Sequence, residues 1–401
     1  MVSEHASPLA ALGGVDAGGQ NVLVGELARA LHGYGATVTI YTRRDDPELP
    51  ARISLASGVT VVHVDAGPPG AIPKDDLLPY MDDFAARLAE DWSNAPPHVV
   101  HAHFWMSGRA ALAAAQPLGL PVVQTFHALG TVKQRHQGSR DTSPPERVGE
   151  EQRIAARADR ILATCTDEVF ELLRMGAHRQ RISIVPCGVD LDLFRPAGPA
   201  CPPRRGLHRV VAVGRLVERK GVGNTISALA ELPGCELLVA GGPEAQHLHE
   251  DQQAGRLLRL AQAEGVADRV QLLGSLERAD VPALMRSADV VACVPWYEPF
   301  GMVAVEAMAC GVPVVASAVG GQVDTVVDGV TGLHVPPRSP DEVARAIGQL
   351  IERPELRKAV GEAGSRRAHD CYGWDSVARA TLGVYEDVRR NRRSWSAEAR
   401  S

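Results

Sequence analysis

Two halves of this chain repeat the same order of elements, and that repetition constrains the fold more than any other feature of the sequence. In each half, short runs rich in β-branched residues precede glycine-rich turns, and Ala-, Leu- and Arg-rich segments follow. This order is typical of parallel strands joined by crossover helices. The sequence therefore predicts an α/β protein with two Rossmann-like, doubly wound domains.

The expected strands fall into two groups. In the first half they are expected at residues 36–42, 59–64, 98–103, 121–127, 160–165 and 182–188. In the second half they are expected at residues 208–216, 235–242, 269–275, 289–295 and 313–319. Only the letters MVS precede the loop that begins at Glu4, which is too short for a full first strand. Either that strand is cut short or the chain begins further upstream.

The boundary between the halves is marked by composition. The segment DLFRPAGPACPPRRG, residues 192–206, has the proline and glycine density of a linker. We expect an N-terminal domain over residues 1–190, a linker over 191–206, a C-terminal domain over 207–370, and a helix and basic tail over 371–401 that crosses back to the first domain. Ligands of such sheets bind outside the carboxyl ends of the strands, so functional residues are expected in a cleft between two facing domains.

Length, charge and cysteine usage limit the partners and the compartment. The 401 residues, 45 % of them hydrophobic, are enough for two cores, and the net charge of −6 gives no general reason to expect nucleic acid. A bound anion must then be held by a local cluster of basic residues. The seven cysteines form no C-x-x-C pair, and we find neither a signal peptide nor an apolar run of membrane-spanning length. We expect a cytoplasmic protein without a transmembrane segment.

A glycine-rich loop precedes the first expected helix. The letters GGVDAGGQN place Gly18 and Gly19 directly before that helix. Glycines let backbone N–H groups approach an anion, and the amino end of a helix adds a favourable dipole. A plain loop is the competing interpretation, since such glycine patterns are weak signals alone. We favour a phosphate site here, and the lack of a G-x-G-x-x-G motif argues against a dehydrogenase.

A cluster of cations follows the first strand of the second half. The segment GRLVERKG offers Arg215, Arg219 and Lys220 between a strand end at Gly214 and a helix start. A guanidinium can grip two phosphate oxygens, and an ammonium acts as a compact charge. A solvated basic turn is the alternative, but the position at the carboxyl end of a strand favours a pyrophosphate site.

Two acids lie in the otherwise apolar segment WYEPFGMVAVEAMACGVPVVAS. If a helix starts near its Phe-Gly-Met turn, the amides of Gly301, Met302 and Val303 lack acceptors within the helix and can hold a phosphate. Glu306 then lies about 7 to 8 Å along the helix axis, which is the separation of a phosphate from a ribose. Its carboxylate can accept two hydroxyl hydrogen bonds. Glu298, on the other side of the phosphates, would meet a sugar.

These segments resemble the retaining nucleotide-sugar glycosyltransferases that include sucrose-phosphate synthase and the mycothiol-pathway N-acetylglucosaminyltransferase, a family with the GT-B fold. The matching segments are GGVDAGGQNV, HAHFWMSG, TFHALGTVK, CGVDLDLFRP, GRLVERKG, EPFGMVAVEAMACGVPVVAS and GGQVDTVVDGVTGLHVPP, in the family's order. The resemblance implies an NDP-sugar donor and a small hydroxyl-bearing acceptor, with no metal and no cofactor. A UDP-sugar is favoured, while UDP-glucose, UDP-N-acetylglucosamine and GDP-mannose all fit the motifs.

The resemblance also implies roles for single residues. It places Glu298 near the hydroxyls of the donor sugar, Glu306 on the ribose, and His127 beside the transferred sugar near its reacting carbon. Arg215 and Lys220 would bind the pyrophosphate. The residues implied in catalysis are His127, Glu298, Arg215 and Lys220. The residues implied in donor binding are Gly18, Gly19, Arg215, Lys220, Glu298, Phe300, Gly301, Met302, Val303 and Glu306.

The acceptor side of the resemblance is incomplete. Family members with phosphorylated acceptors use a lysine after a proline loop and an arginine ahead of an xEQ helix, and Lys74 and Arg147 match these positions. Phe104, however, stands where a tyrosine is found, and Ala128 where a threonine is found. The loss of two hydroxyl donors leaves a phosphorylated acceptor open. The implied acceptor residues are Lys74, Phe104 and Arg147.

Several alternatives stay open at this point. His101, His103 and His127 could suggest zinc, but hydrogen-bonded histidines near a cleft are the favoured interpretation. A non-transferring nucleotide-sugar-binding protein, or a nucleotide-sugar epimerase of related architecture, could use the same donor site. Donor turnover with and without acceptors would separate these from a transferase. A homodimer is also left open.

Overall fold

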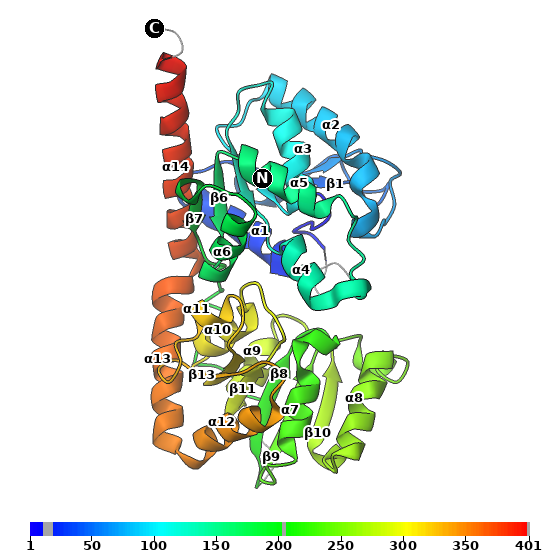
Figure 1. Ribbon diagram of the computed structural model, residues 1–401, viewed down its shortest axis with the longest axis vertical. Coiled ribbons are helices and arrows are strands. Elements are labelled where there is room, and N and C mark those ends of the chain that lie inside the picture. The colour runs from blue at the N-terminus through cyan, green and yellow to red at the C-terminus, as the bar shows by residue number, and fades with distance from the viewer. Residues whose placement is uncertain (11–18, 203–205, 399–401) are drawn as a thin grey trace. The chain divides into compact units, whose positions relative to one another are not determined.

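The computed structural model of the chain describes residues 1–10, 19–202 and 206–398. The chain folds into two compact units (Figure 1). The first unit combines Met1–Pro186 with Trp374–Ser401, and the second unit is Cys187–Gly373. The chain therefore leaves the first unit once and returns to it for the last helix.

The first unit contains a mostly parallel sheet. One part of it has the order β1-β3-β2 and the other the order β4-β5-β6-β7. Neighbouring strands are parallel except β2 and β3, which are antiparallel. The described strands are β1 (Val38–Arg43), β2 (Arg52–Ala56), β3 (Val59–Val64), β4 (Val100–His103), β5 (Val122–Thr125), β6 (Arg160–Ala163) and β7 (Ile182–Ile184).

The first residues of the chain join the two parts of this sheet. Val2 forms parallel bridges both to Tyr41 of β1 and to Ala102 of β4. Its amide donates to the His101 carbonyl at 2.8 Å, and its own carbonyl accepts from the amide of His103 at 2.9 Å. From this position the chain proceeds to β1 on one side and later to β4 on the other. The strand order thus reverses at Val2, and a ligand site is expected at the carboxyl side of this point.

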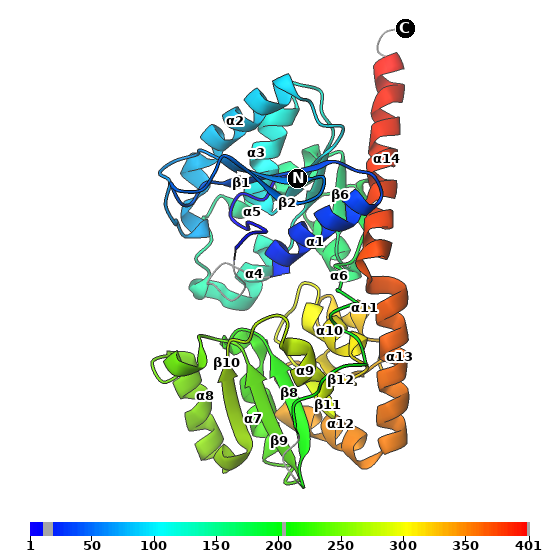
Figure 2. The same ribbon diagram turned by 180° about the vertical axis from the view of Figure 1, so that it is seen from behind.

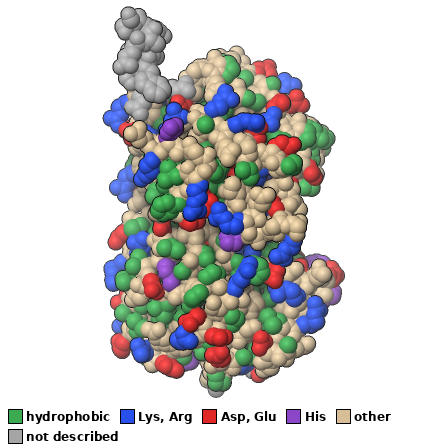
Figure 3. Space-filling model, in the orientation of Figure 1, with side chains coloured by type: hydrophobic (Ala, Val, Ile, Leu, Met, Phe, Trp, Pro, Cys, Tyr) green, Lys and Arg blue, Asp and Glu red, His purple; other side chains and the backbone are tan. Residues whose placement is uncertain are grey.

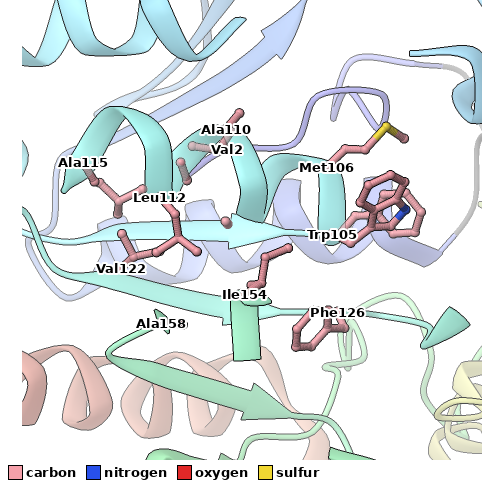
Figure 4. Close-up of a cluster of buried hydrophobic side chains, with 14 of the residues drawn as sticks. Val2, Trp105, Met106, Ala110, Leu112, Ala115, Val122, Phe126, Ile154 and Ala158 are labelled. Carbon is pink, nitrogen blue, oxygen red and sulfur yellow. The ribbon is translucent and has the colours of Figure 1, made fainter. Parts of the chain in front are cut away.

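Helices pack on the faces of the first sheet. Helix α2 packs against α3, and α3 packs against α5. Helix α1 packs against α14 (Figures 1 and 2). In the core, Leu112 of α3 lies beside Val122 of β5, while Met106 and Ala110 extend from the other side of the same helix (Figure 4). The described helices are α1 (Gly19–Gly33), α2 (Met81–Asn94), α3 (Trp105–Ala115), α4 (Gly130–Gln137), α5 (Arg147–Arg157), α6 (Thr166–Arg174) and α14 (Trp374–Glu398).

The sheet of the second unit is parallel throughout its described strands. Its order is β10-β9-β8-β11-β12-β13. These strands are β8 (His208–Val213), β9 (Cys235–Ala240), β10 (Val270–Gly274), β11 (Val290–Cys293), β12 (Val314–Ser317) and β13 (Leu333–Val335). The helices around them are α7 (Val222–Leu229), α8 (Gln252–Ala263), α9 (Val281–Arg286), α10 (Met302–Ala309), α11 (Gln322–Thr325), α12 (Pro340–Glu352) and α13 (Pro354–Tyr372).

The strand order of the second unit locates its ligand-binding edge. The chain runs from β8 through β9 to β10 in one direction, and then returns to β11 and continues to β13 in the other. The order therefore reverses between β8 and β11, and ligands of such sheets bind at the carboxyl ends of the strands at this point. Those two strand ends carry the segments GRLVERKG and WYEPFG.

The structure shows how the surface charges are distributed and where the cysteines lie. On the face drawn in Figure 3, basic and acidic side chains are interspersed rather than gathered into one field. The seven cysteines are free thiols, and Cys165, Cys187, Cys235, Cys293 and Cys310 are buried. Within the described ranges, no helix has both the length and the apolar character needed to cross a membrane.

Candidate active site

The structure brings the two segments at the reversal point of the second unit into contact. The amide of Trp296 donates to the carbonyl oxygen of Arg219 at 2.8 Å. Gly221 follows in the left-handed region at φ 76°, and a Cβ there would collide with the carbonyl oxygen of Val294. Glycine is required at this turn for the close approach of the two loops. The predicted phosphate cluster and the predicted sugar-binding loop are thus parts of one site.

Lys220 and Glu298 form a direct charge-assisted hydrogen bond through Nζ and Oε2. Lys220 ends a short 3₁₀ turn before α7, and Glu298 lies in the loop after β11. Both side chains are partly exposed, at 23 % for Lys220 and 16 % for Glu298. The resemblance assigns the two residues to different parts of the donor, whereas here they contact each other. A phosphate oxygen at Lys220 would compete directly with the carboxylate of Glu298.

The amino end of α10 has the features of an anion site. The helix begins at Met302, and Gly301 before it adopts φ 97° with no side-chain cap and no acid in the first turn. The first N–H groups of a helix have no acceptor within it, and its dipole favours a negative charge there. The helix start expected near the Phe-Gly-Met turn is confirmed to within two residues. Phe300 is buried and packs edge-on against Tyr372, with ring centres 5.9 Å apart.

Two glycines after β12 support this loop and were not singled out by the sequence reasoning. The amide of Gly321 donates to the carbonyl oxygen of Glu298 at 3.0 Å. Gly320 lies in the left-handed region at φ 50°, and a Cβ on it would collide with the same carbonyl oxygen. The pair of glycines directly after a predicted strand, in the letters VGGQ, was the signal that could have identified them.

Gly320→Ala should therefore displace the Glu298 loop and weaken donor binding. We expect a loss of about 1 to 3 kcal/mol in unfolding free energy from strain and collision, with a lower affinity for the donor. Gly329→Ala is the matched control, because Gly329 also has a positive φ, of 72°, but open space around its Cβ position. Thermal unfolding and donor titration of both variants test this. Equal effects of the two substitutions would show that the collision with Glu298 is unimportant.

Glu306 lies in α10 and is paired with an arginine. Its side chain is 8 % exposed, and Oε1 accepts a hydrogen bond from Nη1 of Arg278 at 3.1 Å. Burial raises the pKa of the Glu306 carboxyl, and the Arg278 guanidinium opposes this rise. Arg278 comes from the loop after β10 and also lies over the ring of Phe194, 5.2 Å from its centre. The sequence reasoning missed Arg278, although a basic residue shortly after a strand end was a usable signal.

Other cations surround the loop that carries Glu298. The Cζ atom of Arg219 lies 5.2 Å from the ring centre of Tyr297, and that of Arg338 lies 3.9 Å from the ring centre of Trp296. Arg215 directly follows Gly214 after β8, and its side chain is exposed. Cation–π contacts of this kind stabilise aromatic side chains in fixed orientations. The loop is therefore held by two cations directly before Glu298.

Two strained residues mark the carboxyl ends of β4 and β5 in the first unit. Phe104 has φ 78° and His127 has φ 62°, in the left-handed region that residues with a side chain rarely adopt. Such strain persists where the surrounding structure enforces it, and it gathers at functional sites. His127 Nε2 lies 3.1 Å from Nδ1 of His103. The structure thus places the predicted catalytic histidine at a strand end beside the reversal point of its sheet.

The histidines here are held neutral. His127 is half-buried, and its burial, with a smaller effect of His5, lowers its pKa to about 3. Burial likewise lowers the pKa of His101 and of His103 well below the usual range. His101 is held by Tyr385 Oη at 2.7 Å and by Thr125 Oγ1 at 2.9 Å. These rings can donate and accept hydrogen bonds but carry no charge near neutral pH.

The first glycine loop is only partly described. Gly18 lies outside the described residues, and Gly19 is the first residue of α1. Next to it, Gln20 Nε2 donates to Ser3 Oγ at 3.1 Å and approaches the carbonyl oxygen of His103 at 3.4 Å. The amino end of α1 therefore lies beside the end of β4.

Two of the predicted acceptor residues are in contact. The Arg147 guanidinium lies over the Phe104 ring, 5.0 Å from its centre. Arg147 is buried, and it donates to Glu151 Oε1 at 2.8 Å, to the Ala128 carbonyl oxygen at 2.6 Å and to Ser143 Oγ at 3.1 Å. The position of the missing threonine thus contributes its backbone to Arg147 instead of a hydroxyl group.

Lys74 joins this cluster through a lysine that the sequence reasoning missed. Lys133 on α4 donates to Ser143 Oγ at 2.8 Å and pairs with Asp141 at 2.9 Å. Lys74 and Lys133 lie 4.0 and 3.8 Å from the same oxygen of Asp75. Three cations, Lys74, Lys133 and Arg147, are therefore linked by shared acidic and hydroxyl partners. The letters TVK after the predicted His127 turn were the only signal for Lys133.

Comparisons with known proteins match both halves of the chain. Residues 17–193 match the family described as Glycosyltransferase Family 4, and residues 204–367 match Glycosyl transferases group 1. A D-inositol 3-phosphate glycosyltransferase of Kribbella flavida is 37 % identical, over 96 % of this chain and 94 % of that protein. One of the same name from Mycobacteroides abscessus is 37 % identical, over 100 % of this chain and 93 % of that protein.

Solved structures share the fold over nearly the whole chain. Sucrose-phosphate synthase from Thermosynechococcus elongatus is 30 % identical with a TM-score of 0.87, over 96 % of this chain and 98 % of that one. Anabaena Alr3699/HepE in complex with UDP-glucose is 19 % identical with a TM-score of 0.71, over 96 % of this chain and 98 % of that one, and it shows likeness of fold alone.

Proposed function

Because this chain belongs to glycosyltransferase family 4, we propose that it moves a sugar from an NDP-sugar to a hydroxyl group of a small phosphorylated acceptor of the inositol phosphate class. The observation that carries the donor half is the contact between the cation cluster after β8 and the Glu298 loop, next to the uncapped start of α10. The relatives named D-inositol 3-phosphate glycosyltransferase support the acceptor half.

The donor's diphosphate is proposed to bind at the first turn of α10 and at Lys220 and Arg215. When a phosphate oxygen binds to Lys220, it replaces the carboxylate of Glu298. That carboxylate can then accept hydrogen bonds from the sugar hydroxyls. As the sugar leaves with positive character at its anomeric carbon, negative charge grows on the departing diphosphate. The helix amides and the two cations then stabilise the transition state more than the ground state. These groups take the place of a metal ion in the proposal.

The ribose is proposed to bind at Glu306. Its two carboxylate oxygens can accept both hydroxyl hydrogens of a ribose diol, and Oε1 already accepts from Arg278. A buried carboxylate with one strong partner gains from two further donors, because its remaining lone pairs are otherwise unused. We keep a UDP-sugar as the donor that the family resemblance favours.

The acceptor phosphate is proposed to bind at Lys74, Lys133 and Arg147. Arg147 already uses its donors on Glu151, Ala128 and Ser143, so the lysines provide the adjustable contacts. Both lysines lie near Asp75. A dianionic phosphate would replace this single carboxylate as the partner of their ammonium groups. Phe104 supplies a ring against Arg147 rather than a hydroxyl to the phosphate.

A panel assay tests this function. Purified protein is incubated with UDP-glucose, UDP-N-acetylglucosamine or GDP-mannose and with inositol 3-phosphate or unphosphorylated inositol, and products are measured by mass spectrometry. We expect transfer to the phosphorylated inositol, and an α-configured donor to give an α-linkage by anomeric NMR. Donor binding without transfer to any phosphorylated acceptor would overturn the acceptor assignment, and a β-linkage would overturn retention.

The Lys74→Ala variant tests whether the acceptor phosphate binds at this lysine. We expect the KM for the phosphorylated acceptor to rise about tenfold, equivalent to about 1.4 kcal/mol, while the KM for the donor stays unchanged. The control is Arg87→Ala, which removes an exposed cation of the same unit on α2. If Lys74→Ala behaves like the control, the phosphate does not bind at this lysine.

A further inference from the structure

A stack of histidine rings runs through the first unit beneath His127. His101 and His103 stand two residues apart on β4, so their side chains share one face of the strand. The ring centres of His101 and His103 are 4.1 Å apart, and those of His103 and His127 are 5.3 Å apart. Tyr385 and Thr125 fix the far ring, His101, through one hydrogen bond to each of its nitrogens. His103 is therefore held between a fixed ring and the ring that the proposed function assigns to the sugar.

The contact between His103 and His127 leaves two arrangements of one proton. Both rings are neutral, so each carries a hydrogen on one nitrogen only. Either His103 Nδ1 donates to His127 Nε2, or His127 Nε2 donates to His103 Nδ1, across the observed 3.1 Å. In the first arrangement His127 carries its hydrogen on Nδ1, and in the second Nδ1 is a bare acceptor. A sugar oxygen would therefore meet a hydrogen-bond donor at His127 Nδ1 in the first arrangement and an acceptor in the second.

The other nitrogen of His103 decides between them. Nε2 of His103 is buried and has no hydrogen-bond partner in the described part of the chain. If His127 were the donor, His103 would carry its hydrogen on this Nε2, as a buried N–H group without an acceptor. Buried N–H groups without an acceptor are rarer in proteins than buried acceptors without a donor. An unpaired donor bears the full free-energy cost of its desolvation. The hydrogen-bond network thus assigns the proton to Nδ1 of His103.

We propose that His103 is a positioning residue that donates from Nδ1 to His127 Nε2 and thereby holds His127 as the tautomer with its hydrogen on Nδ1. The inference rests on the proposed role of His127 at the transferred sugar. In this state His127 presents a neutral N–H donor, which can orient a sugar oxygen without adding charge. A protonated ring would repel the positive character that develops at the anomeric carbon.

Two substitutions of His103 separate this role from packing. His103→Asn keeps a donor near the position of Nδ1 but leaves space where the rest of the ring lay. His103→Leu fills more of that space but has no donor. A purely structural role would favour the leucine variant, whereas the tautomer role favours the asparagine variant.

The direct readout is the protonation pattern of the His127 ring. Long-range ¹H–¹⁵N correlation spectra at neutral pH distinguish a hydrogen on Nδ1 from one on Nε2, and His127→Gln assigns the signals by their loss. We expect Nδ1–H in the wild type and in His103→Asn, and a mixture or Nε2–H in His103→Leu. We also expect kcat to fall at least about tenfold in the leucine variant but less than about threefold in the asparagine variant, with the donor KM within about twofold in both.

Each outcome of this experiment bears on one claim. A wild-type His127 with its hydrogen on Nε2 overturns the inference even if no variant folds, and so does a leucine variant with wild-type tautomer and kcat. If His127→Ala leaves turnover unchanged, the proposed role of His127 fails instead, whatever the tautomer. Circular dichroism and thermal unfolding of each variant establish that the compared proteins are folded.

Discussion

Replacing Lys220 with alanine should lower kcat/KM for the NDP-sugar about 10²- to 10³-fold, the range found when one preorganised charge-stabilising group is removed from an active site. Lys220 is the cation that pairs with the carboxylate of Glu298, and in the proposed reaction it stabilises the departing diphosphate. Its loss also leaves the carboxylate of Glu298 without this partner, so repulsion between the carboxylate and the phosphates adds to the effect. Calorimetric titration with the free nucleoside diphosphate should show weaker binding.

The control for this variant is Lys358→Ala. Lys358 is exposed on α13 of the same unit, so its removal changes net charge equally without touching the site. Lys220→Arg should recover part of the activity, because the charge remains but the guanidinium is larger and planar. Wild-type nucleotide affinity and kcat/KM in Lys220→Ala would remove the diphosphate from this position.

His127→Ala should lower kcat about 10²-fold with little change in donor affinity, as expected for a group that acts mainly in the transition state. The residue adopts a strained backbone at a strand end and is held neutral by burial. Single-turnover kinetics at saturating donor, together with equilibrium titration, separate the chemical step from binding. His178→Ala is the control, because this exposed histidine of the same unit lies away from the β4 and β5 ends. Unchanged kcat in His127→Ala would exclude His127 from the mechanism.

The low pKa of His127 adds a dependence on pH. With a folded pKa of about 3, His127 stays neutral across the physiological range, so kcat should show no ionisation of this ring between about pH 5 and 8. Below about pH 6.5 the unfolded chain binds protons that the folded chain does not, so stability should fall as the pH falls. Thermal unfolding from about pH 7 to 5 should show a shallower decline in His127→Gln than in the wild type.

The sequence predicted the principal strands because buried parallel strands are short runs of β-branched residues. It missed β2 and β13. The side chains of β2 are mostly exposed, and this strand is held by its pairing with β3 at the sheet edge. The strand β13 has three residues, Leu333–Val335, and is extended because it pairs with β12. Edge strands depend on a neighbour that local sequence does not reveal.

The enzyme class could be predicted because the segments that carry the family resemblance occur in the family's order along nearly the whole chain. The two-domain α/β fold and the glycosyltransferase class are confirmed, and the relatives do not support the binding-protein and epimerase alternatives. The roles of the single site residues remain predictions. Arg278 and Gly320 were not predicted because their partners lie far away in the sequence. Arg278 contacts Glu306, which lies 28 positions further along the chain, and Gly320 approaches the Glu298 carbonyl; neither contact leaves a periodic pattern.

The contact between Tyr385 and His101 couples the start of the histidine stack to the end of the chain. The two residues are 284 positions apart, and Tyr385 lies on α14, which belongs to the first unit. Because synthesis proceeds from the amino end, the ribosome makes the whole second unit before it makes this partner. During synthesis, the His101 ring therefore cannot form its hydrogen bond to Tyr385 until α14 has been made. The first unit to be started is the last to be completed, so an incomplete chain cannot assemble the support beneath His127.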